Sequence, residues 1–304
     1  MYKYYEKYGE KIMYYEFYSI NEYIEYLLHA KKNPIFTGNA SETGDFAFTD
    51  TGSFEEAINL AKYGYHEDFD KMMELKIKLD KYIKYSNNNS KQYNYYVGYA
   101  PDVKAYLEGS PLSMLNKGSK IRKKIDLYVQ SAYSWITTKE CIYNRGVIVL
   151  SLIQILENLG YNVNLHLFSL TTDDNVNSYF YCDFLLKKEN ERANPQKLYF
   201  PLCHPSWIRR LEFKLKECTP DITNDWSNGY GRLCNCNEIR DFLNLEDNDI
   251  LIPEPRFLGI NGVDLIDDIN KVFDYINEAE TPENLELDKI ERVRKIWIID
   301  LKIF

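Results

Sequence analysis

KIDLYV, at residues 124–129, begins the stretch that decides the fold. After a short polar turn comes the apolar segment CIYNRGVIVLSLIQILENL at 141–159, which Gly160 ends, and a second strand-like run, YNVNLHLF, spans 161–168. A strand, a helix and a strand within about 45 residues predict a right-handed βαβ unit with parallel strands. Because the helical segment has polar residues only at intervals, we expect it to be buried against the sheet.

The chain around this unit predicts further elements. A short polar link leads to a strand at 178–186, which must then run antiparallel to the strand before it. We expect strands at 45–49 and 249–253, and a helix that begins after Ser53 and stops at Gly64, with Glu56 completing a capping box. The predicted division is a mostly helical segment at 1–90, an α/β core at 91–277 and an extension at 278–304 that ends in a strand.

Composition limits the possible functions. The 304 residues carry a formal net charge of −9, which argues against a general electrostatic grip on nucleic acid. A local basic patch could still bind nucleic acid, and the best candidate is the run at 117–124. A solvated approach to the following strand explains this run as well. Its cationic residues are Lys117, Lys120, Arg122, Lys123 and Lys124. No signal peptide and no membrane-spanning run are visible, so the six cysteines indicate reduced thiols in a cytoplasm.

The order of strand, long helix, strand and antiparallel strand resembles the start of a von Willebrand factor A-like domain. In that family the first strand ends in a metal-binding Asp-x-Ser-x-Ser loop, and the matching positions here are Gln130, Ala132 and Ser134. Two of the three ligands, including the carboxylate, are absent, and hard divalent cations prefer anionic oxygen. The resemblance therefore implies a Rossmann-like three-layer sandwich with a degenerate metal site and no cofactor.

A second resemblance covers residues 36–277 and is to an uncharacterised family found largely in bacteriophages and mobile elements. It implies a viral or prophage origin and no particular activity. The matching elements are Phe54-Glu55-Glu56-Ala57 with Gly64, Gly98-x-x-Pro101-x-Val103, Gly109-x-Pro111-x-x-Met114, Arg145-Gly146, His204-Pro205-x-x-x-Arg209-Arg210-x-x-Phe213 and Gly229-Tyr230-Gly231.

The most concentrated candidate for binding lies at His204, Trp207, Arg209 and Arg210. Arginine forks bind phosphate or carboxylate, and a helix N-terminus attracts anions. The alternative is structural: His204 caps the helix while one arginine pairs with Glu212 or with Asp126.

Other polar residues are also candidates for chemistry. Asp173 and Asp174 follow the second strand, at the edge where open α/β sheets bind ligands, although a polar turn explains them as well. Arg145 enters an apolar helix and needs a buried partner, for which Asp126 or Asp183 is available.

Zinc is considered because soft ligands fall close together in the sequence. The usual two-residue knuckle spacing is missing, which favours ordinary thiols over a site. The residues concerned are Cys203, His204, Cys218, Cys234 and Cys236.

No catalytic set is recognisable, so the favoured function is non-enzymatic: binding of another protein, with self-association included, by a phage or mobile-element factor in the host cytoplasm or the virion. One alternative is a metal-dependent hydrolase or nuclease that uses Asp126, Asp173 or Asp174. A nucleic-acid-binding protein that uses residues 117–124 and Arg209–Arg210 is the other.

Overall fold

The computed structural model describes residues 2–7, 9–65, 92–96, 100–117, 124–158, 161–173, 177–222, 229–245 and 249–255. Asp174, most of the basic run at 117–124 and the extension expected at 278–304 lie outside these residues.

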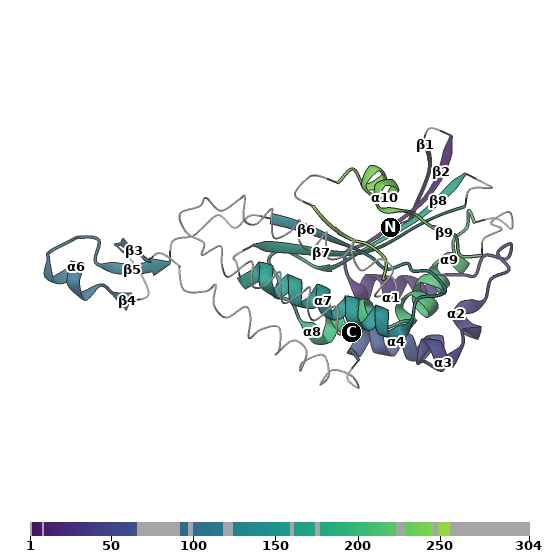
Figure 1. Ribbon diagram of the computed structural model, residues 1–304, viewed down its shortest axis with the longest axis horizontal. Coiled ribbons are helices and arrows are strands. Elements are labelled where there is room, and N and C mark those ends of the chain that lie inside the picture. Colours follow the sequence, from purple (N-terminus) through teal and green to yellow (C-terminus); the bar gives the residue numbers. More distant parts are fainter. Residues whose placement is uncertain are drawn as a thin grey trace.

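The described chain is a mixed α/β protein built on one central sheet (Figure 1). Hydrogen bonds order its strands β1-β2-β8-β7-β6-β10, and β9 pairs with β7. The strands are β1 (Tyr2–Lys7), β2 (Glu10–Phe17), β6 (Lys124–Gln130), β7 (Asn162–Asp173), β8 (Ser178–Lys187), β9 (Arg232–Leu233) and β10 (Ile250–Ile252).

Helices cover both faces of this sheet unequally. The face that carries α1, α4, α7 and α8 is the more thickly covered, and α10 lies on the opposite face (Figure 1). The helices are α1 (Ile20–His29), α2 (Ala40–Thr43), α3 (Phe46–Thr49), α4 (Phe54–Tyr63), α7 (Lys139–Asn158), α8 (Pro195–Cys203), the π-helix η1 (Trp207–Glu212), α9 (Phe213–Glu217) and α10 (Cys236–Leu243).

The predicted βαβ unit is confirmed. β6 and β7 pair in parallel, with Leu127 opposite Leu165, and α7 connects them. Alternate residues of β6, Ile125 and Val129 among them, point into the large core under α7, because successive side chains of a strand face opposite ways. The helix itself is as buried as expected, since Val149 and Ile153 are fully enclosed.

Two further predictions about strands are confirmed. β8 runs antiparallel to β7, and the expected strand near 250 is β10, which pairs in parallel with β6. The N-terminal segment also contributes two strands that the sequence patterns did not predict: β1 and β2 form an antiparallel pair, and β2 joins β8 in parallel. The division of the chain at residues 90 and 277 stays a prediction.

The expected strand at 45–49 is wrong, because residues 46–49 form the one-turn helix α3. The Asp45 carboxylate accepts a hydrogen bond from the Ala47 amide and so caps this turn.

The expected helix after Ser53 is confirmed as α4: Ser53 caps it through the Glu56 amide, and it ends at Gly64. The Glu56 side chain accepts a hydrogen bond from Gly52, one residue earlier than a capping box requires.

A small three-stranded sheet is described separately and is drawn at the left of Figure 1. Its strands are β3 (Gln92–Tyr95), β4 (Ala100–Pro101) and β5 (Met114–Lys117), and β5 pairs with both others in antiparallel register. The short helix α6 (Val103–Leu107) lies between β4 and β5 in the chain, and the Asp102 carboxylate caps it.

None of the helices in the described ranges combines the length and the apolar character that crossing a lipid bilayer requires.

Candidate functional site: an aromatic corner beside the ends of β6 and β10

The chain leaves β6 and β10 at the same edge of the sheet, because these neighbouring strands run in the same direction. Arg145 of α7 joins the two ends: its guanidinium donates hydrogen bonds to the carbonyl oxygens of Gln130 and Pro253. The expectation that Asp126 or Asp183 would pair with this arginine is therefore wrong. Burial lowers the pKa of Arg145 to about 10, which still leaves the side chain charged at neutral pH.

The loop after β6 holds the positions that correspond to the metal-binding loop of A-like domains. The Gln130 side chain is turned into the sheet, where its amide nitrogen donates to the Leu170 carbonyl oxygen over 3.1 Å. Ala132 is buried. The Ser134 amide donates to the Glu254 carboxylate over 3.1 Å. These groups tie the loop to β7 and to the end of β10.

Arg210 organises the segment between α2 and α4. It is 1% exposed, and its guanidinium donates hydrogen bonds of 2.8–3.1 Å to four backbone carbonyl oxygens and longer ones of 3.4 Å to two hydroxyls. Neither Glu212 nor Asp126 is a partner, so the sequence-based pairing is wrong for this arginine. The acceptors are the carbonyl oxygens of Ser41, Glu42, Gly44 and Thr51 and the hydroxyls of Thr49 and Thr51.

His204 and Trp207 are both buried inside the same helical region. His204 is the C-terminal cap of α8, and its Nδ1 accepts a hydrogen bond from the Ser206 amide over 3.2 Å. The Trp207 ring packs against Tyr23 and Phe184 with centroid distances of 5.5 and 5.3 Å. Both side chains therefore contribute to the core rather than to a surface.

Arg209 differs from its neighbour because aromatic rings, not carbonyl groups, surround it. Its guanidinium carbon lies 5.4 Å from the Phe48 ring, 5.3 Å from the Tyr133 ring and 5.2 Å from the Phe213 ring. Its side chain is half-buried, and its Nε has no hydrogen-bond partner. No carboxylate within the described ranges forms an ion pair with it.

Exposed apolar side chains lie close to these ring residues in the sequence. Two residues beyond Tyr133, the Trp135 side chain is 83% exposed and Ile136 is 49% exposed. Two residues before Phe48, Phe46 is 63% exposed. An ion pair between Lys139 and Asp50 links the start of α7 to the end of α3. We call this surface, made of Phe46, Phe48, Tyr133, Trp135, Ile136, Arg209 and Phe213, the aromatic corner.

Two buried ionisable side chains, Glu212 and Lys216, lie on η1 and α9, the helices that carry Arg209 and Phe213. Burial raises the pKa of the Glu212 carboxyl, which lies close to the side chains of Ser131, Ser169 and Trp207. Burial also lowers the pKa of Lys216 to about 8, although the charge of Glu212 opposes this. The Lys216 ammonium donates to the Thr171 hydroxyl and to the Tyr230 carbonyl oxygen. Both groups are shielded from solvent, so they belong to the interior rather than to the surface.

The structure does not gather the proposed metal ligands. Among the described residues, no three His, Cys, Asp or Glu side chains come together in a way that could hold a metal ion. Cys203, Cys218 and Cys234 are buried, and burial raises the pKa of Cys203 and of Cys218, which keeps both thiols protonated. Asp173 is fully buried at the end of β7.

The proposed basic patch is described only at its ends. The Lys124 ammonium pairs with the Asp126 carboxylate over 3.0 Å, and the residues between 118 and 123 lie outside the described chain.

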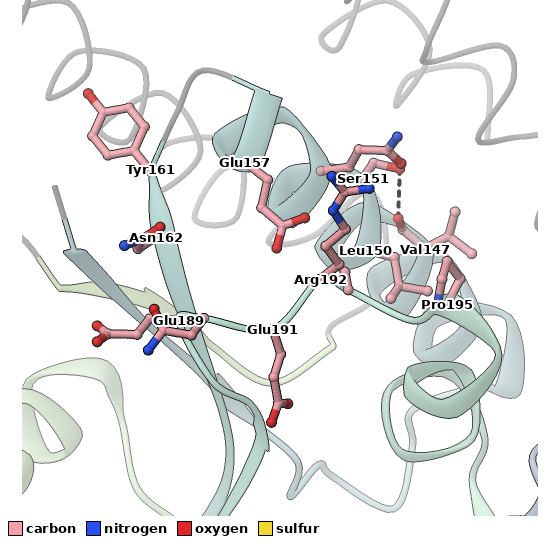
Figure 2. A pocket seen from close by; sticks show the side chains of 13 residues that line it. Val147, Leu150, Ser151, Glu157, Tyr161, Asn162, Glu189, Glu191, Arg192 and Pro195 are labelled. Carbon is pink, nitrogen blue, oxygen red and sulfur yellow. Dashed lines mark hydrogen bonds between the residues drawn. The ribbon is translucent and has the colours of Figure 1, made fainter. Parts of the chain in front are cut away.

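A pocket of about 590 Å³ opens at the other end of α7, between this helix and the loop that precedes α8 (Figure 2). Ser151, Gln154 and Glu157 of α7 form one wall, and the loop carries Glu191 and Arg192. The volume suits a small ligand. Its other lining residues are Val147, Leu150, Tyr161, Asn162, Glu189, Asn190, Ala193 and Pro195.

The charge at the centre of this α7 pocket is already balanced. The Glu157 carboxylate, which points into the pocket in Figure 2, pairs with the Lys187 ammonium over 2.8 Å. Lys187 is 2% exposed and also donates to the Val163 carbonyl oxygen over 2.7 Å. The polar groups that remain can bind water as well as they can bind a ligand, so the pocket indicates no particular chemistry.

Sequence comparison gives one match. A family model described as "Domain of unknown function (DUF7192)" matches residues 3–276. No curated protein and no solved structure matches the chain.

Proposed function

The chain belongs to this family of unknown function, and on that premise we propose that it works by binding another protein through the aromatic corner. The observation that carries the proposal is Trp135, a tryptophan 83% exposed in the loop after β6. Tryptophan buries a large apolar area on binding, and it is among the residues that contribute most to protein–protein affinity. Exposed apolar patches larger than those usual for a monomer are typical of surfaces that bind a partner.

Neighbouring groups support the same proposal. Ile136 and Phe46 are exposed apolar residues close in the sequence to Tyr133 and Phe48, and the half-buried Arg209 lies against the rings of the latter two. Arginine and aromatic residues are enriched at interfaces between proteins. The corner is also rigid at its base, because the Arg210 hydrogen bonds hold the segment that carries α3. A rigid surface loses little conformational entropy on binding.

Two further parts of the proposal rest on resemblance. The resemblance of residues 36–277 to a family found largely in bacteriophages and mobile elements supports a phage or mobile-element factor that acts in the host cytoplasm or in the particle. The order of strand, helix, strand and antiparallel strand, which β6, α7, β7 and β8 follow, supports a Rossmann-like, A-domain-like core. Nucleic-acid binding is less favoured because all the Arg210 donors are used within the protein.

Affinity capture with matched variants tests the proposal. The full chain, its Trp135→Ser variant and its Tyr63→Ser variant are used as baits in extracts of the source cells. Tyr63 is the control because it is 72% exposed at the end of α4. We expect a protein that the wild type and the Tyr63 variant retain and the Trp135 variant loses at least tenfold. Equal retention by all three baits would refute binding through the corner.

A further inference from the structure

Three rings fix the orientation of the Arg209 guanidinium. The rings of Phe48, Tyr133 and Phe213 all lie within 5.4 Å of it, and a cation over aromatic faces is attracted to their electron density. Phe213 is itself stacked on Tyr230 with a centroid distance of 3.7 Å. The Tyr133 side chain also forms a hydrogen bond with the guanidinium, and neither this bond nor the aromatic faces neutralise the charge. Among the described residues the arginine is therefore held in place without a counter-ion.

The donors of this guanidinium have a single hydrogen-bond partner among the described residues, the Tyr133 side chain. An arginine has five N–H donors, and the Arg210 side chain next to it directs its own donors at backbone oxygens and hydroxyls. In Arg209 the Nε is buried without a hydrogen-bond partner, while the side chain as a whole keeps some exposure to solvent. The guanidinium can therefore still bind an acceptor at its solvent-facing edge.

Nearby carboxylates are already engaged with other groups. Asp50 forms an ion pair with Lys139. Glu217 accepts hydrogen bonds from the Ser41 amide and hydroxyl and from the Tyr230 hydroxyl. A carboxylate that pairs with this guanidinium would therefore come from outside the described part of the chain.

We propose that Arg209, which lies against the ring of Tyr133 two residues before the exposed Trp135, is the residue that selects the partner, by pairing with the carboxylate of an aspartate or glutamate in a peptide segment. An apolar residue next to that acid packs on Trp135 and Ile136. This inference rests on the proposed function and adds the chemistry of the partner. A guanidinium matches a carboxylate in a two-pronged geometry that an ammonium cannot reproduce.

A carboxylate fits better than a phosphate. Phosphorylated segments are recognised by clusters of arginines, because a phosphate carries close to two negative charges. At the corner Arg209 stands without a second free cation among the described residues: Lys139 pairs with Asp50, and Arg210 is buried with its donors occupied. A single guanidinium balances one carboxylate.

Peptide display on the immobilised full chain tests the inference. The probe is a random library of 12-residue peptides, and we expect enriched peptides to carry an acidic residue next to an aromatic or aliphatic one. The best peptide is then synthesised with its acid, with the matching amide and with a phosphoserine at that position. Each is titrated against the wild type, Arg209→Met, Arg209→Lys and the control Arg192→Met, which changes an arginine of the α7 pocket.

We expect the effect of replacing the peptide acid by its amide to depend on whether Arg209 is present in the protein. The amide peptide should bind the wild type and the Arg192 variant about tenfold more weakly than the acid does. The Arg209→Met variant should bind acid and amide equally, and Arg209→Lys should keep part of the preference. Circular dichroism checks that each variant is folded, and Arg209→Gln replaces the methionine variant if that one is unfolded.

Failure of the inference can be told apart from failure of the proposed function. A tenfold preference for the acid that persists in Arg209→Met overturns the inference, and so does tighter binding of the phosphoserine peptide. In both cases the proposed function stands if Trp135→Ser abolishes binding. Enriched peptides that bind Trp135→Ser unchanged, or no enrichment at all, overturn both.

Discussion

The two ends of α7 differ in how they satisfy their charged groups. Near the beginning of α7, the aromatic corner holds the Arg209 guanidinium against aromatic rings and exposes the Trp135 side chain. In the described chain, no carboxylate neutralises that guanidinium, and the Trp135 ring is open to solvent. At its end the α7 pocket is concave and polar, but its central carboxylate, Glu157, pairs with the buried Lys187. The pocket is therefore a poorer indication of function here than the aromatic corner, whose arginine has no counter-ion in the described chain.

Arg210→Met tests whether the corner depends on its buried scaffold, and it should have the largest effect. The change leaves several buried carbonyl oxygens of the segment at 41–51 without donors, and hydrogen bonds to charged groups contribute about 1.5–3 kcal/mol each. We expect the free energy of unfolding, measured with urea, to fall by about 3 kcal/mol or more. Arg209→Met is the matched control and should cost about 1–2 kcal/mol, because it removes cation–ring contacts and one hydrogen bond to Tyr133. Equal losses for the two arginines would contradict the division between scaffold and surface.

Gly146→Ala tests whether α7, whose two ends carry the corner and the pocket, is packed tightly against α8. A Cβ at this position would lie 2.3 Å from the Cys203 sulfur and 2.6 Å from the Leu202 carbonyl oxygen. Because α7 would have to move away from α8, we expect the free energy of unfolding to fall by about 2 kcal/mol despite the better helix propensity of alanine. Gln154→Ala, later in the same helix, should change it by less than about 0.5 kcal/mol. A stabilised Gly146→Ala variant would show that the two helices can separate easily.

The pH dependence of stability has a source on the face of the sheet opposite to α7, at the pair formed by His166 and Asp183. Burial alone would lower the pKa of His166, but the hydrogen bond and charge of Asp183 outweigh it and raise that pKa. A raised pKa stabilises the folded state fully below the unfolded value near 6.5, and this contribution is lost as the pH rises through the folded value. We expect His166→Gln to destabilise the protein by about 1 kcal/mol at pH 5.5 and by less at pH 8.5, in thermal unfolding at each pH. A larger loss at pH 8.5 would contradict this sign.

Glu157→Gln should have the smallest effect on the free energy of unfolding. It also tests whether the partner binds at the α7 pocket or at the aromatic corner. Lys187 keeps its hydrogen bond to the Val163 carbonyl oxygen, and the Glu157 side chain is 25% exposed. We therefore expect a loss of about 1 kcal/mol or less in the free energy of unfolding, and no change in partner binding, measured by the affinity capture used for Trp135→Ser. Loss of the partner in this variant would move the binding site to the pocket.

The sequence predicted the elements that depend on local patterns. Apolar and polar residues alternate in the runs at 124–129 and 161–168, and the segment between them is apolar. These features specify β6, α7 and β7 without distant contacts. The pairing of β2 with β8 was not predictable, because its residues are more than 160 positions apart and tyrosines occupy both faces of β2. Residues 45–49 also alternate, yet the capping carboxylate of Asp45 favours a helical turn there.

The site was predictable only in outline. The sequence indicated Arg209 and Arg210 together, but it could not show that backbone oxygens occupy one of them and aromatic rings surround the other. Backbone acceptors leave no trace in a pattern of side chains, so the expected partner of Arg145 was also wrong. Trp135 was missed, although an apolar pair, Trp135-Ile136, five residues after a strand at the carboxyl edge of a parallel unit is a usable signal.

Site-specific photocrosslinking tests the central claim most directly. A photoreactive phenylalanine analogue is placed at Trp135, and in a second protein at Glu191 on the exposed loop of the α7 pocket. Both proteins are irradiated in the source cells. The account predicts one crosslinked partner from position 135 and none from position 191. Crosslinking from position 191 alone, or the same partner in equal yield from both positions, would contradict it.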